Sequence, residues 1–168
     1  MNEKQITKRC TTTLNKQYGL NLTPQTSFQT IFPNNWLGRQ TAVAGTVKSF
    51  GVEIPYGDVS PYFANNATEL AQIIHEYIKP YTKIKTKITQ IFKTEFNIPH
   101  IKQNTNIYTT NNPNITVFGL LSFMTKIEDT FNIKIQNPGK TTQNLDTLEK
   151  WGTYVAQIKG IQIPQKHK

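Results

Sequence analysis

The sequence predicts an all-α protein made of two small four-helix bundles in tandem, and three observations lead to this prediction. Apolar residues recur at intervals of four along several segments, which is the spacing of one helix face. The pattern of the first half returns in the second half about eighty residues later. Loops rich in Asn, Thr and Pro separate these segments. The 168 residues suffice for two compact domains of roughly 80 residues each.

The first predicted helix occurs twice, at a constant offset of 78 residues. The segment ITKRCTTTLNKQYGLNL aligns with IKTKITQIFKTEFNIPH so that the apolar positions coincide. Cys10 falls on this apolar face, and we therefore expect a small buried side chain rather than a reactive thiol. The matched pairs are Ile6 with Ile84, Cys10 with Ile88, Leu14 with Phe92, Tyr18 with Phe96, and Leu20 with Ile98.

A second helix aligns at an offset of 81, because the loop before it is three residues longer in the second half. For the last helix, matching Asn66 with Asn144 returns the offset to 78. Asn66 with Glu69 three residues later is typical of a capped helix start, and Asn144 is the corresponding cap candidate. The pairs in the second helix are Leu37 with Phe118, Val43 with Met124, Phe50 with Phe131, and Ile54 with Ile135.

The boundary between the two units is expected at Lys79-Pro80-Tyr81, where Pro80 should end the last helix of the first unit. The expected organisation is a first unit at 1–80, a second unit at 81–160 and a basic tail at 161–168.

The positive charge is concentrated in the second half. The chain has a net charge of +9; residues 1–80 carry seven basic and five acidic residues, and residues 81–168 carry twelve and five. Lys83, Lys85, Lys87 and Lys93 alternate with apolar residues in the stretch YTKIKTKITQIFK. This pattern indicates either a solvated helix face or a patch that binds phosphate or lipid headgroups.

The sequence offers no pattern typical of an enzyme, a metalloprotein or a membrane-spanning protein. There is one cysteine, and His75, His100 and His167 have no acid or cysteine at ligand spacing, so we expect no metal and no cofactor. Glycine-rich phosphate loops and hydrolase elbows are missing. No apolar run is long enough for a membrane helix or a signal peptide, so a cytoplasmic location is expected.

The layout resembles the acyl carrier protein family. The long loop TPQTSFQTIFPNNWL with its Ser-Phe pair, a helix ending in FGVEI and a short last helix carry the resemblance in the first unit, and IEDTFNIKI carries it in the second. The resemblance covers about 6–78 and 84–158 and rests on pattern more than on identities. It implies two carrier-like bundles, each with its functional position at the start of the second helix.

The resemblance also implies that neither unit can carry a phosphopantetheine arm. In the family, a Ser in an Asp-Ser-Leu motif bears the arm, at a fixed spacing before the Phe that ends the second helix. That spacing places Trp36 at the Ser position in the first unit and Val117 in the second. Neither side chain has a hydroxyl. Thr116 would reach the motif only through a one-residue slip of the alignment, Ser122 is expected on the helix surface, and Ser27 matches a structural loop serine of the family.

The acidic second helix by which family carriers dock onto their enzymes is also altered. Between Leu37 and Phe50 the chain has Arg39 and Lys48 and no acidic residue. The second unit keeps Glu128 and Asp129 beside Lys126, so its second helix is closer to neutral. We therefore expect a non-catalytic protein-interaction or scaffold module, with an acidic acyl carrier protein or a synthase component as its partner.

The candidate interaction residues are Trp36, Leu37, Arg39 and Phe118. Trp36 either projects as an interface anchor or folds inward and plugs the bundle. One alternative function is nucleic-acid or ribosome association through Lys83, Lys85, Lys87 and Lys93. A second alternative is lipid or acyl-chain binding, against which aromatic residues at expected core positions argue: Phe92, Phe96, Phe118 and Phe131.

Overall fold

The computed structural model describes residues 1–110 and 112–164, and in these residues the fold is all-α, as the sequence predicts. The described residues contain helices and loops, and one isolated β-bridge between Asn106 and Thr147 is their only extended pairing. Contacts within the chain divide the described residues into two compact units, one of Met1–Pro80 with residues 162–164 and one of Tyr81–Ile161. No helix in the described part of the chain is long and apolar enough to cross a membrane.

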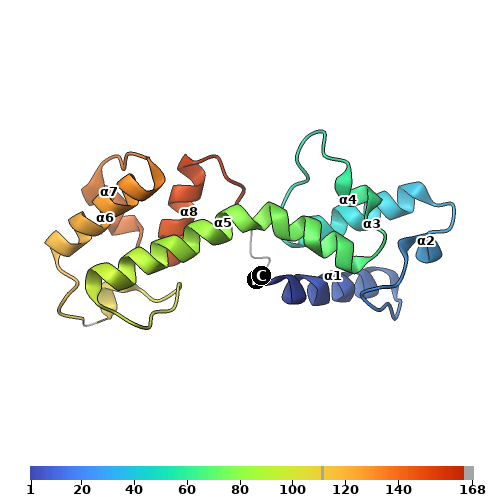
Figure 1. Cartoon of the computed structure of the whole chain (residues 1–168), viewed down its shortest axis with the longest axis horizontal. Helices are drawn as coiled ribbons and strands as arrows, with labels where there is room; N and C mark the ends of the chain where they lie inside the picture. The colour runs from blue at the N-terminus through green and yellow to red at the C-terminus, as the bar shows by residue number, and fades with distance from the viewer. Residues whose placement is uncertain (111, 165–168) are drawn as a thin grey trace. The chain divides into compact units, whose positions relative to one another are not determined.

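The first unit is built from three longer helices and two single-turn helices (Figure 1). The longer ones are α1 (Glu3–Tyr18), α3 (Trp36–Ser49) and the N-terminal part of α5 (Ala67–Phe96), and the short ones are α2 (Phe28–Ile31) and α4 (Ser60–Phe63). Asn2 and Gln5 form a capping box that begins α1. The apolar faces of α1, α3 and α5 meet in one core, with buried Ile6, Cys10 and Leu14 contributed by α1.

The helix α5 does not end at Pro80, contrary to the sequence prediction. It continues through Pro80 to Phe96, so one helix supplies the last helix of the first unit and the first helix of the second. Proline in a helix interior removes one backbone hydrogen bond and costs about 3 kcal/mol. The apolar stripe nevertheless continues across the proline, with Ile78, Tyr81 and Ile84 all buried. Burial of this stripe offsets the local cost.

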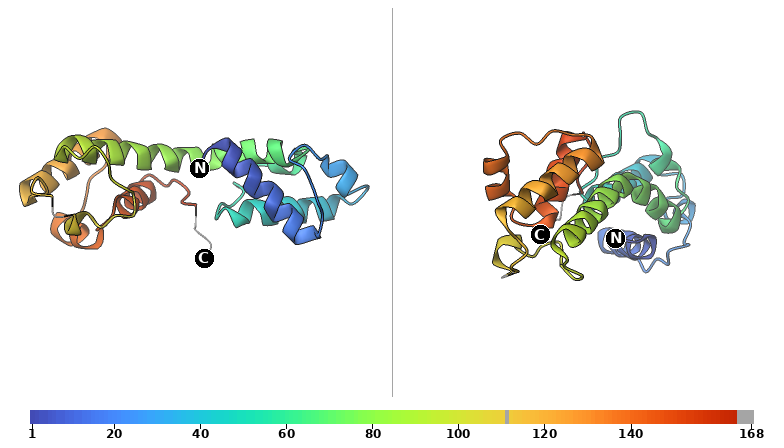
Figure 2. Two further views of the ribbon diagram at one scale, coloured as in Figure 1. Left: turned by 90° about the horizontal axis from the view of Figure 1, so that it is seen from below. Right: turned by 60° about the vertical axis from the view of Figure 1, so that its left-hand side comes forward.

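The second unit repeats this order of elements. After the C-terminal part of α5 come a 3₁₀ turn, η1 (Ile107–Thr109), and the helices α6 (Val117–Phe131), α7 (Pro138–Asn144) and α8 (Leu148–Ile158), which Figure 2 shows from two further directions. Its core is aromatic: the ring of Phe123 packs against the rings of Phe92, Phe96 and Trp151, with centroids 5.3–6.1 Å apart. Phe118, which was expected in this core, is instead exposed, and Phe131 is half-buried.

The helix ends of the two units match in detail. Gly19 after α1 and Asn97 after α5 both adopt the left-handed conformation that ends a helix, with φ of 62° and 51°. Asn35 before α3 and Thr116 before α6 are both side-chain caps. The loop ties also correspond: the Phe28 N–H donates to the Asn65 carbonyl and the Ile107 N–H donates to the Asp146 carbonyl, each at 2.7 Å.

The last helix of the second unit begins later than the sequence alignment predicts. Asn144 is the final residue of α7 rather than a helix cap, and the cap of α8 is Thr147, whose hydroxyl accepts from the Lys150 N–H. The predicted cap Asn66 does hold the start of α5, where its side chain accepts from the Glu69 N–H at 3.0 Å. Asn66 and Thr147 are 81 residues apart, so the offset of the second helix persists into the last one.

The structure confirms only some of the predictions for the tail and for the aligned positions of the first helix. Residues 161–164 follow α8 as loop, and the remainder of the predicted basic tail, with His167, lies outside the described residues. Tyr18 and Leu20 are substantially exposed, although Phe96 at the position equivalent to Tyr18 is buried. Cys10 is fully buried, as predicted.

Candidate functional site

The start of α3 presents an apolar pair to solvent. Asn34 adopts a left-handed conformation, and the Asn35 side chain then accepts from the Gly38 N–H at 2.8 Å and caps the helix. This cap makes Trp36 and Leu37 the first two residues of α3. Trp36 is 47% exposed and Leu37 is 73% exposed.

Trp36 lies on the surface of the first unit and does not plug the bundle. Its ring packs against the exposed ring of Phe63 from α4, with centroids 5.7 Å apart. The Arg39 guanidinium lies 5.8 Å from the Trp36 ring centroid and donates to the Ala64 carbonyl at 2.7 Å. Three of the four candidate interaction residues from the sequence are therefore neighbours at the start of α3. Phe63 was missed, because only the fold brings α4 beside Trp36.

The start of α6 presents a corresponding apolar pair in the second unit. The Thr116 hydroxyl accepts from the Gly119 N–H at 3.1 Å, which makes Val117 and Phe118 the first residues of the helix. Val117 is 73% exposed and Phe118 is 83% exposed. Leu121, four residues after Val117, is also exposed and extends the apolar surface along the helix. The spacing of four between Val117 and Leu121 could have indicated this surface from the sequence.

A close helix approach explains the glycine in the first turn of α6. A Cβ on Gly119 would lie 2.7 Å from Cε1 of Phe96, whose ring is fixed in the aromatic core. The start of α6 is therefore held directly against α5. The exposed Val117 and Phe118 belong to the first turn of this packed helix.

Neither α3 nor α6 begins with a residue that carries a hydroxyl. Trp36 and Val117 occupy the equivalent first positions of α3 and α6. The Thr116 hydroxyl is one residue earlier and is engaged as the helix cap. Ser27 caps α2 through the Gln29 N–H, and Ser122 is half-buried on α6, where it hydrogen-bonds with Glu95.

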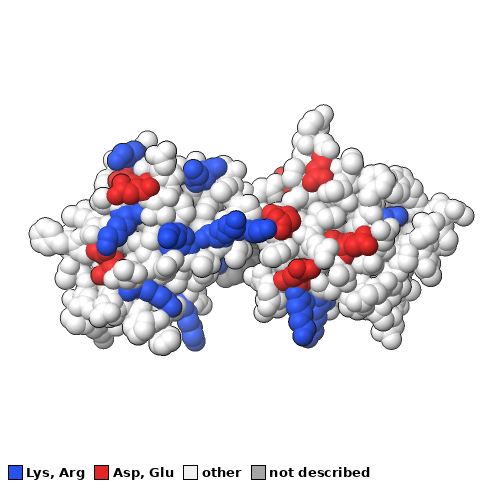
Figure 3. Space-filling model, in the orientation of Figure 1, with Lys and Arg blue, Asp and Glu red and all other residues white. Residues whose placement is uncertain are grey.

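The predicted lysine patch is only partly a surface patch. Lys83 and Lys87 are exposed on α5, one turn apart, and no carboxylate among the described residues lies within ion-pair distance of them. Lys93 is half-buried. On one face of the molecule, basic side chains form a row along α5 (Figure 3).

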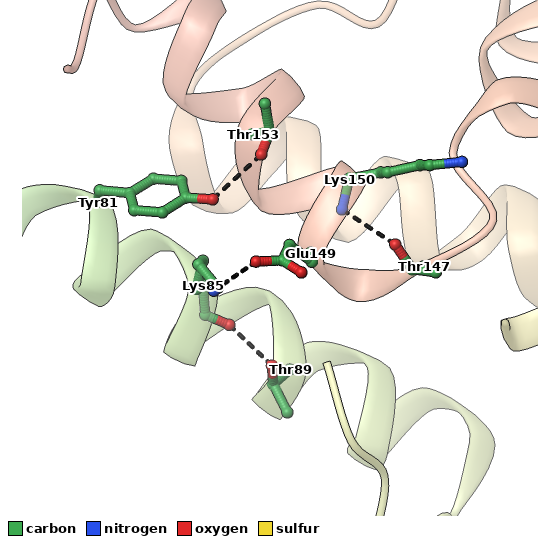
Figure 4. A network of polar contacts seen from close by, with 7 residues as sticks. All are labelled: Tyr81, Lys85, Thr89, Thr147, Glu149, Lys150 and Thr153. Atoms are coloured by element: carbon green, nitrogen blue, oxygen red, sulfur yellow. Dashed lines mark hydrogen bonds and ion pairs between the residues drawn. The ribbon is translucent and has the colours of Figure 1, made fainter. Parts of the chain in front are cut away.

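Lys85 instead faces the interior of the second unit. Its Nζ lies 3.4 Å from the Glu149 carboxylate of α8 and 5.3 Å from the centre of the Tyr81 ring (Figure 4). Beside it, the Tyr81 and Thr153 hydroxyls are 3.1 Å apart and also join α5 to α8. A Cβ on Gly152 would lie 2.7 Å from Cγ of Lys85, so α8 packs closely on this side chain. Lys85 therefore holds two helices together.

The titratable groups of the described residues show no arrangement for metal or thiol chemistry. No group of three or more His, Cys, Asp or Glu side chains gathers there. Burial raises the pKa of the Cys10 thiol to about 12, so the thiol is neutral at physiological pH. In the first unit, the Tyr77 hydroxyl donates to the Asp58 carboxylate at 2.6 Å, and this bond lowers the pKa of Asp58.

Comparison with known proteins gives no match to a family model, to a curated protein or to a solved structure.

Proposed function

We propose that this chain is a non-catalytic protein-interaction module, built from two acyl-carrier-like units that have exchanged the prosthetic-group site for an exposed apolar anchor. One observation carries the proposal: in both units, the second long helix begins with two solvent-exposed apolar residues. These are Trp36 with Leu37 on α3 and Val117 with Phe118 on α6. Aromatic side chains are enriched among the residues that dominate binding at protein interfaces.

The matching of the two units supports the part of the proposal in which one helical unit occurs twice in tandem. Helix order, helix caps, left-handed helix ends and the loop tie between the first long loop and the last helix all recur. The residues at the carrier attachment position lack a hydroxyl in both units, so the module is proposed to take no phosphopantetheine and to catalyse no reaction.

The charge of the chain favours an acidic partner. The chain carries a net charge of +9, and the first turns of α3 and α6 contain no acidic residue. In the first unit the anchor is flanked by Arg39, whose guanidinium lies over the Trp36 ring. Opposite charge accelerates association and disfavours partners of like charge. An acidic acyl carrier protein or a synthase component that binds one would complement this surface.

The two alternative functions have less support. Nucleic-acid binding would use the lysines of α5. Lys85 is paired with Glu149, so Lys83 and Lys87 are the exposed lysines of the predicted patch. Acyl-chain binding would need space between the helices, whereas buried aromatic rings occupy the core of the second unit.

The proposal is tested by measuring binding to purified acyl carrier proteins of the host with biolayer interferometry. We expect Trp36→Ala and Phe118→Ala each to weaken binding by about tenfold or more, as for interface hot spots. Tyr56→Ala removes a fully exposed aromatic ring from a loop of the first unit and is the matched control. It should change the affinity by less than about twofold, because surface residues outside an interface contribute little.

Two outcomes would contradict the proposal. One is a wild-type chain that binds no host carrier or carrier-associated protein. The other is a carrier affinity that Tyr56→Ala lowers as much as Trp36→Ala. In a parallel arm, a single-stranded RNA is titrated at several salt concentrations. Tight binding that falls steeply with salt and is lost in Lys83→Gln with Lys87→Gln would favour the nucleic-acid function instead.

A further inference from the structure

An open pocket of about 690 Å³ lies in the second unit, beside the C-terminal end of α5. Lys93 supplies one wall from the last turn of α5, and the loop that leads to α6 supplies the rest. Ligand pockets in proteins commonly have volumes of roughly 300–1,000 Å³. The lining includes Lys93, Ile98, Ile101, Lys102, Thr105 and Asn112.

The loop that forms the pocket is tied to the body of the second unit. The Asn114 side chain donates to the Phe96 carbonyl at 3.1 Å and closes the base of the loop against the end of α5. The Ile107 N–H donates to the Asp146 carbonyl at 2.7 Å, and the fully buried Ile107 side chain anchors the middle of the loop. The Thr110 hydroxyl donates to the Ile107 carbonyl at 3.0 Å. These hydrogen bonds tie the middle and the end of the loop to the rest of the second unit.

The pocket has positive charge without a protein counter-ion. Lys93 and Lys102 line it, and no carboxylate does so among its described lining residues. Of the five carboxylates in 81–161, Asp129 lies on α6 outside the lining, and the other four are within ion-pair distance of different lysines. These pairs are Lys85–Glu149, Lys126–Glu95, Lys134–Glu128 and Lys150–Asp146.

Four other lining residues suit a ligand with both a polar and an apolar part. Asn112 uses its side-chain oxygen to accept from the Asn114 N–H at 2.9 Å, which leaves its amide N–H groups as the donors for a ligand. Thr105 adds a hydroxyl. Ile98 and Ile101 are half-buried and give the pocket an apolar side.

We propose that this pocket binds a small organic phosphate, with the phosphate at Lys93 and Lys102 and the organic part against Ile98 and Ile101. A phosphate monoester carries up to two negative charges and three acceptor oxygens, and the lining of this pocket offers two ammonium groups together with the Asn112 and Thr105 donors. The site lies on the loop before α6 and does not involve Trp36 or Phe118. It therefore stands independently of the proposed interaction function.

The proposal is tested on the full-length protein by titration with phenyl phosphate, followed by amide chemical shifts in ¹⁵N-labelled protein. Phenol and inorganic phosphate are the matched ligands that lack the charge and the apolar part respectively. Lys102→Gln is the main variant because Lys102 is exposed and its loss should leave the fold intact, and Lys93→Gln is the second. Lys87→Gln removes an exposed lysine of α5 that does not line the pocket and controls for general electrostatics.

We expect saturable shifts at amides of 98–110, with phenol and inorganic phosphate binding more weakly than phenyl phosphate. Lys102→Gln should weaken the binding of phenyl phosphate by about tenfold and Lys87→Gln by less than about twofold, since a direct ionic contact exceeds a screened one. Absence of saturable shifts at these amides would overturn the proposal. Equal weakening by Lys87→Gln and Lys102→Gln would also overturn it, as would equal affinity for phenol. Equal affinity for inorganic phosphate would overturn the assignment of an organic ligand.

Discussion

The two tryptophans of the chain provide a direct comparison between an anchor on the surface and a residue of the core. Trp36 begins α3 and is 47% exposed, whereas Trp151 on α8 is fully buried. Replacing each with alanine should therefore have very different consequences for stability. The comparison matters for function, because an interaction anchor must be dispensable for folding.

The expected magnitudes follow from the contacts of each ring. Trp36→Ala removes one aromatic contact with Phe63 and one cation–π contact with Arg39. These are together worth about 1–2 kcal/mol of unfolding free energy. Trp151→Ala empties a site packed against Phe123 and should cost about 3–5 kcal/mol, in the range of buried aromatic deletions.

Native-state hydrogen exchange measures the two effects in the unit where each occurs. The readouts are the amides of Val47 on α3 for Trp36→Ala and of Ile127 on α6 for Trp151→Ala, since both side chains are buried in their cores. Tyr56→Ala, at a fully exposed ring, should change protection by less than about 0.5 kcal/mol. Equal destabilisation by Trp36→Ala and Trp151→Ala would refute the reasoning, because Trp36 would then be a core residue.

Three further predictions concern groups with a defined local role. Thr116→Val should lower the unfolding free energy of the second unit by about 1 kcal/mol in urea titrations through loss of the helix cap, while Thr116→Ser, which keeps the hydroxyl, should retain it; equal loss in both would contradict a capping role. Tyr77→Phe should raise the pKa of Asp58 in carboxyl ¹³C NMR titrations. The pKa of Asp58 is lower in the folded protein than in the unfolded chain. Asp58 therefore stabilises the fold at a pH above its unfolded pKa, and this stabilisation is lost as the pH falls through its folded pKa. An unchanged pKa of Asp58 in Tyr77→Phe would refute the assigned cause. Cys10 should resist a thiol reagent in the folded protein and react once the chain is unfolded, because the thiol is buried with a pKa near 12; rapid labelling of the native protein would contradict this.

The periodic apolar pattern predicted the helices and much of the core. Ile6, Cys10 and Leu14 lie at intervals of four and are buried together on α1, and their aligned partners on α5 are buried as well. Such positions are predictable because burying an apolar helix face is the main source of stability for a helix in a small domain. The class of fold was accordingly predictable from the sequence.

The local signals at helix ends were less reliable. Pro80 would end an isolated helix, but continuous burial of neighbouring apolar side chains carries α5 through it. Asn144 and Thr147 are both residues of the type that caps helices, so residue type alone could not place the start of α8. These errors arise where tertiary packing decides between local options of similar energy.

The candidate site was predictable in position and less so in composition. Trp36 and Phe118 were both candidate interaction residues, but the sequence left the direction of Trp36 open and also placed Phe118 among the expected core positions, whereas the structure exposes both. The contact with Phe63 could not be predicted, since it depends on where α4 packs. The direction of the Lys85 side chain could not be predicted either. The alternation of lysines with apolar residues suggested a common patch with Lys83, whereas the Lys85 side chain turns inward to Glu149.

The central claim is tested most directly by incubating the full-length protein with coenzyme A and a broad-specificity phosphopantetheinyl transferase, then measuring its intact mass. An authentic acyl carrier protein in the same reaction shows that the enzyme is active. The account predicts that the mass of this chain stays unchanged, because the first residues of α3 and α6 offer no hydroxyl to attack the phosphoryl group. A mass gain of one phosphopantetheine group, mapped by peptide sequencing to the start of either helix, would contradict it.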